Sequence, residues 1–194
     1  MIVGMIEYLF KLRGYIKFSV RIFMLSLIVG AYIAIYHSVE TQAVVNWAAE
    51  ALSSGMELSR FELFLFIFRN NTTALFYSLI ESVVFGISSI MMIVANGVIV
   101  GVFMILVTQK ISFIYFILGI APHGIFEIPA AIITASMGMR IGSTVIAKLT
   151  KKNVSIIKEI YDALKCYFML IVPLLFVAAL IEAFVTPVIL SLVS

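Results

Sequence analysis

The chain has 194 residues, of which 63% are hydrophobic and 12% are charged, and its formal net charge is +3. Soluble domains carry about 25% charged residues and about 45–50% apolar residues, so this composition excludes an ordinary soluble domain. The small positive charge gives no reason to expect nucleic-acid binding, and the single cysteine, Cys166, excludes an intrachain disulfide.

Long apolar runs indicate membrane-spanning helices. Strands of a membrane barrel alternate apolar and polar residues, and these runs do not. Because lipid offers no partners for backbone groups, each span must satisfy them internally. We therefore expect an all-α membrane protein, a single polytopic domain over residues 1–194 with about five transmembrane helices plus interfacial amphipathic helices. The predicted spans cover residues 18–36, 72–95, 98–120, 124–146 and 166–190.

The charges between the spans predict an orientation. Four basic residues lie before or at the start of the first span: Lys11, Arg13, Lys17 and Arg21. Lys and Arg are enriched in cytoplasmic loops, so we expect a cytoplasmic N-terminus. The acidic segment 37–71 is expected to lie outside along the interface, and the lysine-rich segment 147–165 is expected to be a cytoplasmic connection. Five spans then place the C-terminus outside.

Two polar pairs interrupt the middle of the chain. Asn96-Gly97 predicts a tight turn between the second and third spans, while Gly97 and Gly101, four residues apart, permit close helix approach. Gln109-Lys110 interrupts the third span. Either Lys110 extends to the interface from a longer span, or a short span ends there and residues 109–121 are re-entrant.

The stretch from Ala121 to Gly142 combines an apolar sequence with ionisable residues. Such residues at membrane depth are costly and are candidates for function. His123 and Glu127 are four residues apart, so they share one face of a helix. We expect this helix to begin near Gly124, with His123 at its N-terminus, and to bend at Pro129.

Two further carboxyl groups, Glu81 and Glu182, lie inside predicted spans. On the predicted topology they lie toward the same side as His123 and Glu127, which predicts an intramembrane polar cluster of four residues. Glu81 is the first candidate partner for His123. The cluster has three interpretations: interhelical hydrogen bonding, a zinc site based on His123 and Glu127, and proton-coupled transport.

Catalysis is not expected from this sequence. A nucleophilic mechanism needs a nucleophile beside a base and an orienting group. Ser136 and Ser143 lie several turns from His123, and no histidine lies near Cys166 in the sequence. We therefore expect a protein that is not an enzyme and requires no cofactor, with zinc as the one candidate ligand.

The sequence PHGIFEIPA, followed by GMRIG, resembles the stage II sporulation protein M family of integral membrane proteins. Asn96-Gly97 with Gly101, and Asn70-Asn71, are similar to other recurrent features of that family. The resemblance assigns a structural motif to eight residues: Asn96, Gly97, Gly101, Pro122, Gly124, Pro129, Arg140 and Gly142.

The resemblance implies a non-enzymatic membrane scaffold that organises partner proteins. The family's namesake acts in engulfment during sporulation, in a complex with the stage II sporulation proteins D and P, which remodel peptidoglycan. For this chain we expect the lipid bilayer, unidentified membrane or cell-envelope proteins and a second copy of itself as partners. The homodimer is expected because the predicted helices have small-residue faces. The alternative function is a small transporter or channel-like protein that uses the His/Glu cluster.

Overall fold

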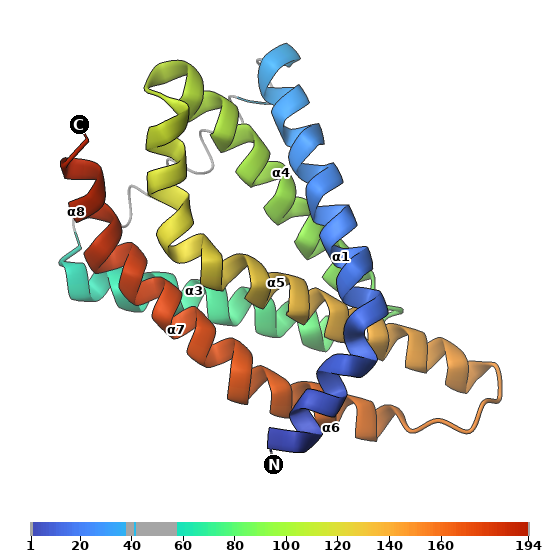
Figure 1. Ribbon diagram of the computed structural model, residues 1–194. Helices are drawn as coiled ribbons and strands as arrows, with labels where there is room; N and C mark the ends of the chain where they lie inside the picture. The colour runs from blue at the N-terminus through green and yellow to red at the C-terminus, as the bar shows by residue number, and fades with distance from the viewer. Residues whose placement is uncertain (1, 38–40, 42–57, 194) are drawn as a thin grey trace.

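The computed structural model describes residues 2–37, 41 and 58–193. Every secondary-structure element within these residues is a helix, and Figure 1 shows their course. The elements are α1 (Ile2–Tyr36), α3 (Arg60–Glu81), α4 (Ile87–Lys110), α5 (Phe113–Leu149), α6 (Ile156–Cys166), η1 (Tyr167–Ile171), α7 (Val172–Leu180), η2 (Ile181–Val185) and α8 (Thr186–Ser191).

Five continuous helical stretches are long and apolar enough to cross a membrane. They are Gly4–Tyr36, Arg60–Glu81, Ile87–Lys110, Phe113–Leu149 and Ile156–Ser191. The predicted all-α membrane fold with five long apolar helices is therefore confirmed. The N-terminus and the connection between α5 and α6 lie toward one end of the molecule, and the C-terminus lies toward the other (Figure 1).

The predicted limits of the middle spans are wrong. Asn96 and Gly97 lie inside α4, where the Asn96 side-chain amide donates to the Met92 carbonyl at 2.9 Å. The chain instead turns between Glu81 and Ile87, where Phe85 and Gly86 have φ angles of 56° and 76°. Asn-Gly promotes turns in water, but a helix in lipid keeps its backbone bonds unless another segment replaces them.

A helix ends at Gln109-Lys110, as the second alternative predicted, but the residues that follow do not form a short separate segment. Helix α4 ends at Lys110 and α5 begins at Phe113, capped by Ser112, whose hydroxyl accepts from the Tyr115 amide at 3.0 Å. Residues 113–120 therefore form the start of the next long helix. Part of the predicted interfacial segment, residues 60–71, belongs to α3, whereas most of the remainder lies outside the described residues.

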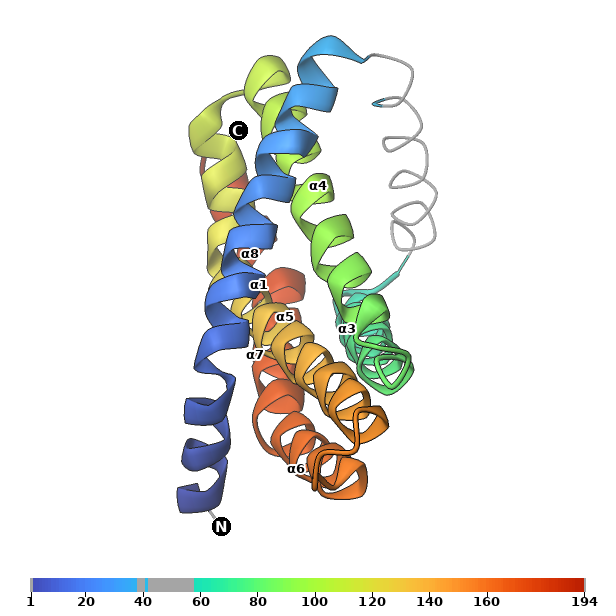
Figure 2. The same ribbon diagram turned by 90° about the vertical axis from the view of Figure 1, so that its right-hand side faces the viewer.

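Helices α1 and α4 run side by side in the same direction (Figures 1 and 2). Gly97 and Gly101 of α4 contact the α1 backbone. A Cβ at Gly97 would lie 2.7 Å from the Phe23 carbonyl oxygen, and one at Gly101 would overlap the Leu27 carbonyl oxygen. These two glycines therefore serve helix packing, the second role predicted for them.

The turn between α3 and α4 rests on α5. Gly138 and Gly142 share one face of α5; a Cβ at Gly142 would overlap the backbone of Phe85 and Gly86, and one at Gly138 would overlap the hydroxyl of Ser89. Ser82 and Ser89 also hydrogen-bond to each other at 2.6 Å beneath this turn. The glycine pair in GMRIG thus makes room for the α3–α4 turn.

A buried ion pair joins α5 to α6. The Arg140 Nε donates to a Glu159 carboxylate oxygen at 2.6 Å, and Glu159 is only 8% exposed. The Arg140 guanidinium also lies over the Tyr8 ring of α1, 5.9 Å from its centroid. Arg140 therefore links three helices near the end of the molecule that carries the N-terminus.

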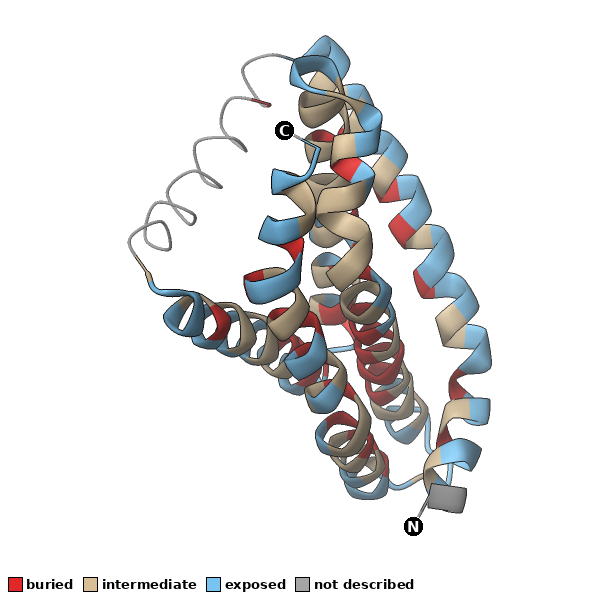
Figure 3. Ribbon diagram, turned by 60° about the vertical axis from the view of Figure 1, so that its left-hand side comes forward, coloured by how far each residue is buried: buried red, intermediate tan, exposed pale blue. Residues whose placement is uncertain are grey.

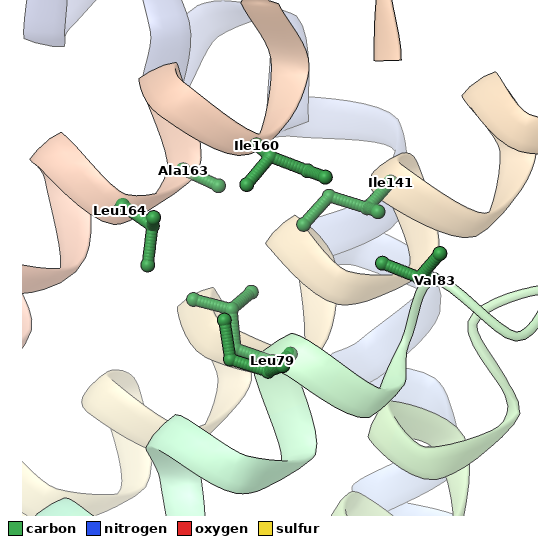
Figure 4. Close-up of a pocket in the computed structure, with 7 residues that line it drawn as sticks. Leu79, Val83, Ile141, Ile160, Ala163 and Leu164 are labelled. Carbon is green, nitrogen blue, oxygen red and sulfur yellow. The ribbon is translucent and has the colours of Figure 1, made fainter. Parts of the chain in front are cut away.

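Most of the buried residues of α5 lie between Ala130 and Gly142 (Figure 3). Beside this stretch lies an apolar cavity of about 90 Å³, between α3, α5 and α6. Leu79, Val83, Ile141, Ile160 and Leu164 point toward it in Figure 4. Because its lining contains no ionisable group, the cavity is not a candidate site for polar chemistry.

Replacing Gly142 by Ala tests the close contact between α5 and the α3–α4 turn. The added Cβ meets backbone atoms, so we expect a loss of about 1–3 kcal/mol in the free energy of unfolding. Gly14→Ala is the matched control, because nothing lies within 4 Å of its Cβ, and it should be neutral or stabilising by up to about 1 kcal/mol. Denaturation of the purified protein in detergent measures both. Equal stability of the two variants would contradict the packing described.

Glu159→Gln tests the buried ion pair. The variant leaves the Arg140 charge without its carboxylate. We expect a loss of about 2–3 kcal/mol, less than the roughly 3–5 kcal/mol of a fully buried pair, because the Arg140 side chain is 25% exposed. Asp162→Asn removes the exposed pair with Lys158 and should cost about 0.5 kcal/mol or less. A Glu159→Gln protein as stable as Asp162→Asn would show that the pair is unimportant.

Candidate functional site

The site begins with the bend of α5. Pro122 and Pro129 lie inside this helix and cannot donate to the carbonyls of Leu118 and Ile125, four residues earlier. Figure 1 shows α5 changing direction along this part of its length. The prediction that the helix begins near Gly124 is wrong: Ser112 caps it more than two turns earlier, and His123 lies in its interior.

Two π-helical turns shape the C-terminal helix. The Val172 amide donates to the Tyr167 carbonyl, and the Thr186 amide donates to the Ile181 carbonyl, each five residues earlier. A proline, Pro173 or Pro187, is the second residue after each of these turns. Because proline lacks an amide hydrogen, it disturbs the regular hydrogen-bond pattern there. Such π-turns occur frequently at functional sites, and Glu182 lies within the second one.

The bend and the second π-turn bring three ionisable side chains together. One ligand atom from each of His123, Glu127 and Glu182 lies within 4.8 Å of the other two, and all three residues are half-buried. The His123 Nδ1 atom is shielded from solvent and has no hydrogen-bond partner among the described residues. We call these three residues the His–Glu–Glu cluster.

Glu81, the fourth residue of the predicted cluster, does not belong to it. Its side chain is exposed at the end of α3, where it accepts a hydrogen bond from the Ser88 hydroxyl at 2.8 Å. The prediction placed Glu81 within a span that continues to residue 95, whereas α3 ends at Glu81. Glu81 is therefore not a partner of His123.

The eight residues of the predicted structural motif lie in different parts of the fold. Pro122 and Pro129 shape the bend, whereas Gly97, Gly101 and Gly142 allow close packing elsewhere. The remaining members are Asn96 within α4, Arg140 in the buried ion pair, and Gly124, which is buried but leaves ordinary space for a Cβ.

The composition of the cluster suits a transition-metal ion. An imidazole nitrogen with two carboxylate oxygens is a donor set that zinc accepts, with a fourth position left for water. Zinc-to-ligand distances of about 2.0–2.2 Å require the donor atoms to lie within about 4 Å of one another, so a small side-chain rotation would complete the site. Two carboxylates this close repel each other unless a positive charge lies between them. A bound cation removes that repulsion, and so does a proton shared by the two carboxyl groups.

Sequence reasoning missed Glu159 and misplaced Arg69. Glu159 shares a face of α6 with the buried Ala163 and Cys166, and this spacing was the available signal. Arg69 fell within the segment 37–71, which was expected to lie along the interface. The structure places Arg69 near the middle of α3, with its side chain exposed.

Comparison with known proteins agrees with the sequence resemblance. The family model described as stage II sporulation protein M matches residues 19–187. An uncharacterized protein from the archaeon Methanocaldococcus jannaschii is 37% identical over 126 residues, which cover 62% of this chain and 69% of that protein. No solved structure matches. The chain belongs to the stage II sporulation protein M family.

Proposed function

We propose that this protein is a non-enzymatic membrane scaffold in which a zinc ion at the His–Glu–Glu cluster holds α5 to the C-terminal helix. The observation that carries the proposal is the meeting of His123, Glu127 and Glu182 within 4.8 Å. Two residues come from α5 and one from η2, so a shared ion joins segments that are distant in the sequence. Family membership supports a role in the membrane.

The donor set favours zinc over the hard cations. Calcium takes six to eight oxygen ligands, and magnesium usually keeps several waters, whereas zinc accepts nitrogen and oxygen ligands at low coordination number. The shielded Nδ1 of His123 supports this choice, because it is a nitrogen ligand atom without another role among the described residues.

The location of the cluster supports a structural role. Proline weakens both helices beside it, since Pro122 and Pro129 interrupt the α5 hydrogen bonds and Pro187 follows η2. A helix without a complete hydrogen-bond pattern needs other contacts to keep one direction. An ion bound by both elements supplies such a contact, and the bend it fixes sets the surface that the scaffold offers to membrane or cell-envelope partners.

Elemental analysis of the purified protein tests zinc binding. We expect about one zinc per chain in wild-type protein and a loss of zinc in His123→Ala and Glu182→Gln. Glu81→Gln is the matched control, because Glu81 lies outside the cluster, and it should retain zinc. Added zinc at about 100 times its Kd should stabilise the wild type by about 2.7 kcal/mol and leave His123→Ala unchanged. Wild-type protein that takes up no zinc from zinc-containing buffer would contradict the proposal.

A second candidate function is cation transport through the same cluster. All three residues are half-buried, so each side chain is partly accessible from outside the protein. A cation could therefore reach the cluster and leave it, as transport requires. Zinc or proton flux into liposomes that is lost in Glu127→Gln would support transport. Retained zinc binding without flux would favour the scaffold.

A further inference from the structure

The outward face of α3 carries polar side chains in the middle of a membrane-length helix. Arg69, Asn70 and Thr73 are all exposed and lie on one side of the helix at positions i, i+1 and i+4. The exposed residues Glu62, Phe66 and Tyr77 extend the same face along the helix. We call this surface the α3 face.

The opposite side of α3 is held against the rest of the molecule. Phe64 is buried, and its ring meets the Phe176 ring of α7 edge to face with centroids 5.3 Å apart. The Tyr167 hydroxyl donates to the Thr72 carbonyl at 2.5 Å. These contacts fix the rotation of α3, so Arg69 cannot turn inward without breaking them.

Arg69 lies too deep in α3 to reach either end. It is nine residues from Arg60 and twelve from Glu81, which at the helical rise is about 13 Å and about 18 Å along the axis. Both distances exceed the length of an arginine side chain. Lipid headgroups at the ends of the helix are therefore out of reach.

The Arg69 charge has no partner within the described part of the chain. The ion pairs there join Arg140 to Glu159 and Lys158 to Asp162. The two acids of α3 are engaged elsewhere: Glu62 accepts from the Ser59 amide and hydroxyl, and Glu81 accepts from Ser88. An arginine at the centre of a membrane helix costs about 2.5–3.5 kcal/mol in insertion measurements, so a partner is required to offset this cost.

We propose that the α3 face is the docking site for a transmembrane helix of another protein that carries an Asp or Glu at mid-depth. A carboxylate matches the planar guanidinium of Arg69 in two parallel hydrogen bonds, and the Asn70 amide and Thr73 hydroxyl add donors beside it. A symmetric second copy does not fit. A two-fold axis along the membrane normal would place α3 beside its equivalent with Arg69 facing Arg69.

This inference gives a partner to the proposed scaffold, but its chemistry does not involve the His–Glu–Glu cluster. The probe is a synthetic transmembrane peptide of 22 Leu and Ala residues with one central Glu, compared with the same peptide carrying Gln. Binding to the full-length protein in phosphatidylcholine vesicles is measured by energy transfer between labelled protein and labelled peptide.

Wild-type protein should bind the Glu peptide at least tenfold more tightly than the Gln peptide. Arg69→Leu should remove the difference, and Arg69→Glu should restore tight binding to a peptide with a central Lys. The matched control is Lys110→Leu, which removes an exposed basic residue at the end of α4 and should bind like wild type.

Two results would overturn the proposal. One is equal binding of the Glu and Gln peptides to wild-type protein. The other is modification of Arg69→Cys by a membrane-impermeant maleimide as fast as Asn153→Cys in the exposed α5–α6 connection, which would place the α3 face in water. Zinc content measured on the same preparations separates the proposals, because Arg69→Leu should retain zinc.

Discussion

The bend of α5 determines where the ionisable side chains of this protein meet. Helix α5 leaves the turn after α4 in one direction and then changes course, so that its second half packs against the α3–α4 turn. Pro122 and Pro129 make this course possible because each removes one backbone hydrogen bond. At the bend, ligand atoms of His123, Glu127 and Glu182 lie within 4.8 Å of one another, and this proximity gives the protein its candidate metal centre.

Close contacts between the other helices and α5 hold the bent helix in place. Glycines let α1 contact α4, and they let the α3–α4 turn contact α5, through backbone atoms rather than long side chains. Lipid tails are as apolar as the side chains they surround, so close packing and interhelical polar contacts hold membrane helices together. The ion pair of Arg140 with Glu159 adds such a contact near the end that carries the N-terminus. The packing residues of α5, Gly138, Arg140 and Gly142, thus lie in a different part of the helix from His123 and Glu127.

The sequence predicted the helical membrane class and five long helices because apolar length is a local property. It also grouped His123, Glu127 and Glu182, since each is an ionisable residue within an apolar run. It misplaced Glu81 because the turn after this residue depends on Gly138 and Gly142, more than fifty positions later. The partner of Arg140 and the exposure of Arg69 were hidden for the same reason: both depend on which face of a helix is packed.

X-ray absorption at the zinc K-edge of the zinc-loaded protein identifies the ligands of the bound ion. A zinc ion at the His–Glu–Glu cluster should be bound by one imidazole nitrogen and by carboxylate or water oxygens at about 2.0–2.2 Å, with no sulfur. The imidazole signal should disappear in His123→Ala. A sulfur ligand at about 2.3 Å would assign the ion to Cys166 instead, and a shell of oxygens alone would show that His123 does not bind it. The first result would contradict a metal centre at the bend of α5, and the second would contradict the three-residue site that includes His123.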